Sequence, residues 1–423
     1  MSSVYPIKGR AAKMGGLEEL YIHIPFCSRK CFYCDFASRA TRNDSPLIAS
    51  YIDALIHEVQ LLAKAGILAH THTIYIGGGT PSLAGPELVR LVEALKRCCL
   101  YVEEFSCEAN PESLSKDLAD KLIDAGITRF SIGVQSFDDT ELALLGRQHK
   151  AQEAYDIIFY LTSTHPQVAV SCDLMCAIPE QTDASWQQTL EKAMQTGVHH
   201  ISVYPLAIEP NTVFDRKYPT TPEFNTPEVQ AYRMQQAADF LRAHGFVRYE
   251  TASYAREGYC CRHNIGYWSG ATYLGLGTQA SSMFSHDLYA ALTDVFPQLP
   301  QAGSEICRVR ITQTDSPSAY AQAKLLSNYH FDLEFLDIYQ ATAEDVMLAA
   351  RMPDGLSEAC IQWGQAVFGA RFDAACDKAA AEGLIVYDAQ GGFSITERGW
   401  LLGNELFSIM WSLADGEVIC SHC

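Results

Sequence analysis

The chain has 423 residues, of which 48% are hydrophobic, so it can bury a substantial core and form two or three domains. Its formal net charge of −19 repels phosphate backbones and argues against a general nucleic-acid-binding protein. Fifteen cysteines are too sparse for a disulfide scaffold. Because no signal peptide is visible, free cysteines indicate a reducing compartment, so we expect a cytoplasmic protein. No apolar run approaches the roughly 18 residues that cross a bilayer, so we expect no transmembrane segment.

The first half of the chain alternates between short apolar runs and helical patterns. Residues 1–18 are expected to be a flexible, mildly basic leader. Six predicted strands follow: Leu20–Ile24, Thr73–Ile76, Glu104–Glu108, Arg129–Val134, Val168–Met175 and His200–Leu206. The predicted helices between them include Leu47–Ala65, Gly85–Arg97, Ser115–Ala125 and Ser185–Gln195. This alternation indicates an α/β fold with a parallel sheet, an open or partial (β/α)6 barrel whose sites gather at the carboxyl ends of the strands.

Three cysteines, Cys27, Cys31 and Cys34, follow the first strand in the spacing C-x3-C-x2-C. Thiolates this close in sequence converge easily on one centre, and soft sulfur ligands select zinc, copper(I) or an iron–sulfur cluster. A closed zinc site or a four-cysteine cluster needs a fourth ligand, which this loop does not supply. The spacing therefore predicts a site with one open coordination position. A structural zinc site completed by His23 or by a distant cysteine is the alternative.

The sequence from Tyr21 through the cysteine loop, with Tyr33 just before the third cysteine, resembles the radical S-adenosylmethionine (SAM) enzymes. More narrowly, it looks like the branch of the oxygen-independent coproporphyrinogen III oxidases. In that superfamily three thiolates hold a [4Fe–4S] cluster, and SAM chelates the fourth iron through its amino and carboxylate groups. One electron then cleaves SAM to a 5′-deoxyadenosyl radical. The resemblance implies that Cys27, Cys31 and Cys34 hold the cluster, with Tyr21 and Tyr33 beside the cofactors.

The residues at the ends of the second and third strands resemble SAM contacts of this family. Gly78, Gly79 and Thr80 form a glycine-rich loop in which the backbone can approach a ligand closely. Taken alone, this pattern also fits a plain tight turn. Glu108 ends the third strand, where a carboxylate can hold the amino group of SAM, whereas Asn110 suits a helix cap better.

Four further positions match the family order along the later strands. Gln135 would be a neutral hydrogen-bonding group at the end of the fourth strand, and Arg147 could pair with the carboxylate of SAM. Asp173 would be an uncomfortable buried charge unless hydrogen-bonded, and the resemblance places it near the ribose. Ala207 matches the adenine-side wall. From the residue type alone, Arg147 fits a surface ion pair better.

A second cluster of reactive residues contains His263, followed by Tyr267 and Trp268. A histidine among aromatic residues is often purely structural, yet a neutral imidazole is also a good axial ligand for haem iron. H-N-x-x-Y-W resembles the haem-binding motif of the HemW-type haem chaperones. This resemblance implies that His263 binds haem iron while the two aromatic rings cover the porphyrin. Cys260 and Cys261 are alternative ligands.

The pattern changes from Ala343 onward to helices followed by a short hairpin and a last helix, which predicts a mainly helical, winged-helix-like domain. Residues 331–423 contain fifteen Asp or Glu against four Lys or Arg, a balance poorly suited to DNA. Cys420 and Cys423 have a metal or redox spacing but receive no role. The expected division is a leader at 1–18, the radical SAM core barrel at 19–245, an accessory region with the haem motif and connector at 246–335, and the C-terminal domain at 336–423.

The residue at position 36 distinguishes two functions known in this branch, coproporphyrinogen III oxidase and haem chaperone. A true coproporphyrinogen III oxidase carries a further cysteine two positions after the third cluster ligand, where this chain has Phe36. The resemblance therefore implies a haem chaperone that binds a [4Fe–4S] cluster and SAM and delivers haem to haem-dependent proteins, served by an electron donor. The oxidase or another radical SAM tetrapyrrole enzyme is the alternative, and a metal-stabilised scaffold is the alternative of another class. The sequence does not decide whether SAM is cleaved, whether the protein forms a homodimer or whether it contacts a membrane peripherally.

Overall fold

A computed structural model describes residues 16–323, 325–389 and 391–414. The six predicted strands lie side by side in chain order and all run parallel. They are β1 (Glu19–Ile24), β4 (Thr73–Gly78), β5 (Glu104–Ala109), β6 (Arg129–Gln135), β7 (Ala169–Cys176) and β8 (His200–Pro205). This arrangement confirms the predicted α/β class and its six-unit parallel core.

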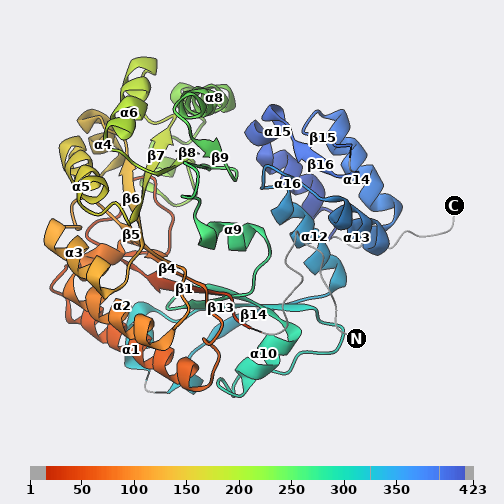
Figure 1. Cartoon of the computed structure of the whole chain (residues 1–423), viewed down its shortest axis with the longest axis horizontal. Coiled ribbons are helices and arrows are strands. Elements are labelled where there is room, and N and C mark those ends of the chain that lie inside the picture. The colour runs from red at the N-terminus through yellow and green to blue at the C-terminus, as the bar shows by residue number, and fades with distance from the viewer. Residues whose placement is uncertain (1–15, 324, 390, 415–423) are drawn as a thin grey trace.

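Helices cover the outer face of these strands (Figure 1). They are α1 (Pro46–Lys64), α2 (Pro86–Cys98), α3 (Lys116–Ala125), α4 (Asp139–Leu145), α5 (Ala151–Thr164), α6 (Asp183–Gln195) and α8 (Pro227–Ala243). Ser45 and Ser115 begin α1 and α3 by accepting hydrogen bonds from backbone N–H groups of the first turn. Leu55, Leu91 and Leu122 are fully buried and belong to the core that the helices share with the sheet.

The sheet continues beyond the six parallel strands at both edges. Next to β1 lie β11 (Tyr273–Leu276), β12 (Ser281–Ser285), β13 (Arg308–Gln313) and β14 (Phe331–Leu336), of which β11 is parallel to β1 and the others antiparallel to their neighbours. Next to β8 lie β10 (Ser253–Ala255) and β9 (Val247–Arg248). The predicted connector within 246–335 thus contributes strands to the main sheet, together with α10 (His286–Thr293) and α11 (Pro317–Gln322).

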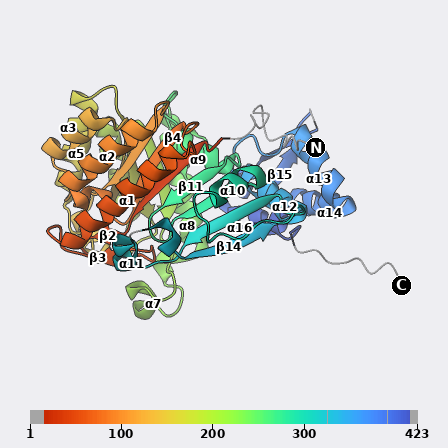
Figure 2. The same ribbon diagram turned by 90° about the horizontal axis from the view of Figure 1, so that it is seen from below.

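A separate helical unit ends the described chain, as Figures 1 and 2 show in blue. It contains α12 (Ile338–Ala349), α13 (Glu358–Phe368), α14 (Ala370–Ala381), the hairpin β15 (Ile385–Tyr387) and β16 (Phe393–Ile395), α15 (Glu397–Leu401) and α16 (Gly403–Trp411). Phe372 and Leu406 lie in a core of its own. The order of helices, hairpin and last helix confirms the predicted mainly helical C-terminal region.

The helix α9 (Arg262–Trp268) carries the histidine–aromatic motif and packs against both β4 and α12. Figure 1 shows it between the sheet and the C-terminal unit. The motif therefore lies at the contact between the sheet and the C-terminal unit. None of the helices within the described residues combines the length and the apolar composition that crossing a membrane requires.

Candidate functional site

The cysteine loop begins where β1 ends and is closed by a short strand pair. β2 (Phe26–Cys27) pairs in parallel with β3 (Arg39–Ala40), so the chain returns to its starting point after the last cysteine. The thiols of Cys27, Cys31 and Cys34 are half-buried. Burial raises the pKa of the Cys27 and Cys34 thiols. The three predicted ligands therefore lie together at the carboxyl end of β1.

The glycine-rich loop packs directly on the cysteine loop. The N–H of Gly79 donates to the carbonyl of Ile24 at 2.9 Å, and the N–H of Thr80 donates to the carbonyl of Phe26 at 2.8 Å. A Cβ atom on Gly79 would lie 2.7 Å from the Phe26 oxygen and 2.9 Å from the Cys27 sulfur. The Thr80 hydroxyl also donates to that sulfur at 3.5 Å. Glycine at position 79 is thus required by the close approach of two loops, beyond what a plain turn would need.

Two carboxyl groups, those of Glu108 and Asp173, face the barrel interior next to this loop. Glu108 accepts hydrogen bonds from the Tyr75 hydroxyl at 2.8 Å and from the N–H of Gly78 at 3.1 Å. Asp173 accepts from the Ser131 hydroxyl at 3.2 Å. Burial raises the pKa of Glu108 to about 7 and that of Asp173 to about 6. A cationic ligand entering here would favour the ionised form of both groups.

Arg147 connects the glycine-rich and cysteine loops. Its guanidinium donates to Cys31 Sγ at 3.7 Å, to Asn110 Oδ1 at 2.8 Å and to the carbonyl of Gly133. Asn110 in turn donates to the Thr80 hydroxyl at 3.0 Å. The expectation that Asn110 caps a helix is wrong, because Ser115 caps α3 while the Asn110 side chain bridges two site residues. The interpretation of Arg147 as a surface ion pair is wrong as well, because its side chain is turned inward.

The remaining predicted cofactor contacts lie around this centre. The Tyr21 ring stacks 6.3 Å from the Tyr75 ring, and the Tyr33 hydroxyl lies within hydrogen-bonding reach of the Arg147 guanidinium. Gln135 ends β6 in a left-handed backbone conformation with φ of +69°. Ala207 lies exposed just beyond β8. Tyr21 is the third of the six residues of β1, whereas Tyr33, Gln135 and Ala207 lie at or beyond the carboxyl ends of the parallel strands, where binding sites of such folds form.

The zinc alternative finds little support in the surroundings of the cysteine loop. Both ring nitrogens of His23 have partners, since Nδ1 lies 2.9 Å from the Tyr21 hydroxyl and Nε2 lies 3.0 Å from the Ala37 carbonyl. Among the described residues, no three His, Cys, Asp or Glu side chains converge closely enough to hold a single metal ion. A four-iron cube holds its thiolates further apart than one ion does.

His263 lies at the other end of the barrel interior, beside the first residue of β4. Its ring is 1% exposed, and Nδ1 lies 2.8 Å from the Thr73 hydroxyl. The ring stacks on Tyr75 with centroids 5.2 Å apart and meets the edge of Tyr267 at 4.7 Å. Burial lowers the pKa of His263 to about 3, so the imidazole is neutral. The five residue steps from Thr73 to Gly78 span about 16 Å of strand, so the structure keeps the histidine apart from the cysteine loop.

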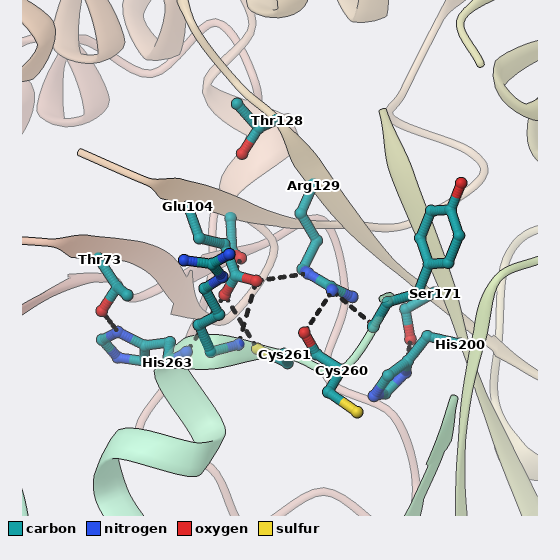
Figure 3. A network of polar contacts seen from close by, with 12 residues as sticks. Thr73, Glu104, Thr128, Arg129, Ser171, His200, Cys260, Cys261 and His263 are labelled. Carbon is teal, nitrogen blue, oxygen red and sulfur yellow. Dashed lines mark hydrogen bonds and ion pairs between the residues drawn. The ribbon is translucent and has the colours of Figure 1, made fainter. Parts of the chain in front are cut away.

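Sequence reasoning missed Tyr75, which links these two ends. Its ring contacts His263 and Tyr21, and its hydroxyl donates to Glu108. The period of two along β4 places Tyr75 on the same face as Thr73, which is the one signal that could have identified it. The polar pair Glu104 and Arg129, which contacts the segment before α9 (Figure 3), was missed as well.

The comparisons with known proteins agree with this geometry. The sequence model of the Radical SAM superfamily matches residues 21–193. The protein named heme chaperone HemW from Escherichia coli K12 is 38% identical over 267 residues, which cover 62% of this chain and 68% of that protein. The HemW of Lactococcus lactis is 35% identical over 289 residues, covering 67% of this chain and 74% of that protein. The chain belongs to the HemW family of radical SAM proteins.

The similarity to the HemW family extends over almost the whole chain in a more distant relative. The HemW of Bacillus subtilis is 29% identical over 400 residues, which cover 92% of this chain and 98% of that protein. Among solved structures, the coproporphyrinogen III oxidase of Escherichia coli superposes with a TM-score of 0.74 at 21% identity, covering 94% of this chain and 91% of that chain. This likeness confirms the predicted fold, and the family implies an iron–sulfur cluster and SAM.

Proposed function

We propose that this protein binds haem at His263 and passes it to haem-dependent proteins, while a [4Fe–4S] cluster and SAM occupy the carboxyl end of the barrel. The observation that carries the proposal is the Nε2 atom of His263. It is buried and has no hydrogen-bond partner within the described residues, although buried polar atoms in folded proteins almost always have one. A neutral imidazole with an unused ring nitrogen is suited to an axial position on haem iron.

The cofactor end of the site has the donors that a cluster and SAM require. Cys27, Cys31 and Cys34 would hold the cluster, which supplies one electron for SAM cleavage when it is bound. Glu108 would hold the amino group of SAM, and Arg147 would hold its carboxylate. The other proposed contacts are Tyr21, Tyr33, Gly78, Gly79, Thr80, Gln135, Asp173 and Ala207. Burial raises the pKa of Glu108 to about 7, and an amino group that donates a hydrogen bond to this carboxylate would stabilise its ionised form.

At the haem end, His263 suits iron better than Cys261, one of the two alternative thiol ligands. The Cys261 thiol donates to a carboxylate oxygen of Glu104 at 3.3 Å, and burial raises its pKa. It is therefore held as a neutral thiol, which binds metals poorly. His263 itself is covered by Tyr75 and Tyr267, so a porphyrin can reach Nε2 only if α9 moves outward. Haem loading would thus be coupled to opening of α9.

Haem titration tests this assignment directly. The wild-type protein and His263→Ala are titrated with ferric haem while the Soret band is recorded, and His165→Ala, which removes a half-buried histidine paired with Asp120, is the control. The expected result is a saturable Soret shift in the wild type and the control, lost or moved in wavelength in His263→Ala. An unchanged Soret band in His263→Ala would remove that residue from the site.

The oxidase alternative predicts a different product. Phe36, at the position of the further oxidase cysteine, is 66% exposed and offers no thiol or proton-transfer group. We therefore expect no decarboxylation when reconstituted protein, SAM and a reductant are incubated anaerobically with coproporphyrinogen III. Detection of the doubly decarboxylated product would favour the oxidase. The proposal places the protein in the cytoplasm, where a cellular electron donor would serve it. The thirteen cysteines of the described residues are all free, as a reducing compartment would keep them.

A further inference from the structure

A buried ion pair lies next to the segment that leads into α9 (Figure 3). Arg129, the first residue of β6, donates from Nε to Glu104 Oε2 at 3.1 Å, and Glu104 is the first residue of β5. The two side chains are 4% and 8% exposed. Burying two charges is expensive, and such a pair persists only where further hydrogen bonds satisfy the remaining donors and acceptors. The partners of those hydrogen bonds show what the pair does.

Most of those partners come from one stretch of backbone, Tyr259 to His263. Glu104 accepts from the N–H of Arg262 at 3.1 Å and from the N–H of His263 at 3.2 Å. Arg129 Nη2 donates to the carbonyls of Tyr259 at 2.6 Å and Cys260 at 2.9 Å. The anion thus binds backbone donors and the cation binds backbone acceptors of the same segment.

The charge state of the pair follows from this arrangement. Burial alone would raise the pKa of Glu104, but Arg129 and the backbone N–H groups of Arg262 and His263 lower it below its ordinary value. The carboxylate is therefore ionised when it binds the segment. Charge-assisted hydrogen bonds of this kind are stronger than those between neutral groups. Residues 259–263 thus bind two charged side chains that lie 130 or more positions away from them in the sequence.

We propose that Glu104 and Arg129 are positioning residues that hold α9 in register, so that His263 faces Thr73 and offers Nε2 as the ligand nitrogen. The statement about haem rests on the proposed function, whereas the statement about backbone order does not. Thr73 completes the arrangement, because its hydroxyl bonds Nδ1 at 2.8 Å and leaves Nε2 as the other nitrogen. The three residues that hold α9 begin three neighbouring strands: Thr73 begins β4, Glu104 begins β5 and Arg129 begins β6.

Hydrogen exchange of the haem-free full-length protein tests the positioning. Glu104→Gln keeps the side-chain shape, but its amide nitrogen cannot accept a hydrogen bond and its charge is gone. We expect exchange in peptides covering 259–268 to become at least tenfold faster in Glu104→Gln. The matched control is Glu58→Gln, the same substitution at a buried carboxyl group on α1 that accepts a hydrogen bond from the Tyr320 hydroxyl, whereas α9 packs against β4 and α12. Unchanged exchange in Glu104→Gln, or equal acceleration in the control, would overturn the positioning.

A haem titration of the same variants then tests the link to the ligand. We expect Glu104→Gln to bind haem at least tenfold more weakly or with a shifted Soret band, and Glu58→Gln to match the wild type. Faster exchange with an unchanged Soret titration would overturn the claim that the pair positions the ligand. If the wild type binds no haem, the proposed function fails, while the exchange data still decide the backbone claim. If circular dichroism shows that Glu104→Gln does not fold, Arg129→Gln tests the carbonyl half, with the same two outcomes.

Discussion

Replacing Gly79 by Ala should disturb the cysteine loop. The added Cβ would lie 2.7 Å from the Phe26 oxygen, a separation that side-chain Cβ atoms essentially never show, so backbone must shift. Overpacking of this kind costs about 1–3 kcal/mol. The shift also moves the carbonyl that accepts the 2.8 Å hydrogen bond from the N–H of Thr80, which adds about 1 kcal/mol. The expected loss of stability is therefore about 2–4 kcal/mol.

The consequence for the cluster can be measured separately from this loss of stability. Thermal denaturation gives the stability, and iron and sulfide analysis after anaerobic reconstitution gives cluster content. Gly258→Ala is the control, because Gly258 has a φ of +83° with open space around its α-carbon, so the substitution adds backbone strain of about 1 kcal/mol without touching the loop. We expect reduced iron only in Gly79→Ala. Wild-type stability and full iron content in Gly79→Ala would refute the reasoning.

Three further predictions concern other parts of the molecule. Replacing any one of the three loop cysteines by Ala should abolish the four-iron absorbance, whereas Cys172→Ala, at a buried thiol, should keep it. The pKa of Glu108 is raised to about 7, so its carboxyl group is mostly neutral below that pH, and SAM affinity measured by equilibrium dialysis should weaken as the pH falls from 8 to 6. Glu108→Gln should bind SAM weakly, with a flatter pH profile. An unaltered SAM affinity in this variant would contradict the assignment. The Arg351 guanidinium lies over the rings of Trp268 at 4.9 Å and Phe407 at 4.0 Å, and so links α9 to the C-terminal unit. Arg351→Ala should therefore lower the free energy of unfolding by about 1–2 kcal/mol and release the C-terminal unit faster in limited proteolysis. An unchanged cleavage rate would contradict this link.

The parallel core could be predicted from the sequence because short strand-like runs alternate regularly with helical patterns along the first half of the chain. The cysteine spacing and the glycine-rich loop likewise carried enough local information to predict where a cofactor site would form. Strands β12 and β13 were not predicted, because their alternation of polar and apolar residues is short and lacks a clear turn signal. They acquire their structure from pairing with β11 and β14.

The polar interior could not be predicted in detail, because its contacts join residues far apart in sequence. Glu104 and Cys261 are 157 positions apart, yet they lie within hydrogen-bond distance. Asn110 illustrates the same difficulty, since its local sequence favours a cap while the fold turns its side chain toward Thr80 and Arg147. The burial of His263 also depends on the packing of α9 against β4, which no local pattern encodes. The domain boundaries and the individual cofactor contacts stay predictions.

The chaperone role depends on direct delivery, which a transfer experiment measures. Protein loaded with haem is mixed with the haem-free form of a b-type haem protein, with and without an excess of a free-haem scavenger, and the acceptor's Soret band is followed over time. We predict that the acceptor gains haem at a rate that the scavenger does not reduce, and that His263→Ala, which lacks the proposed ligand, delivers none. Transfer that disappears when the scavenger is present would show release into solution and would contradict the proposed function.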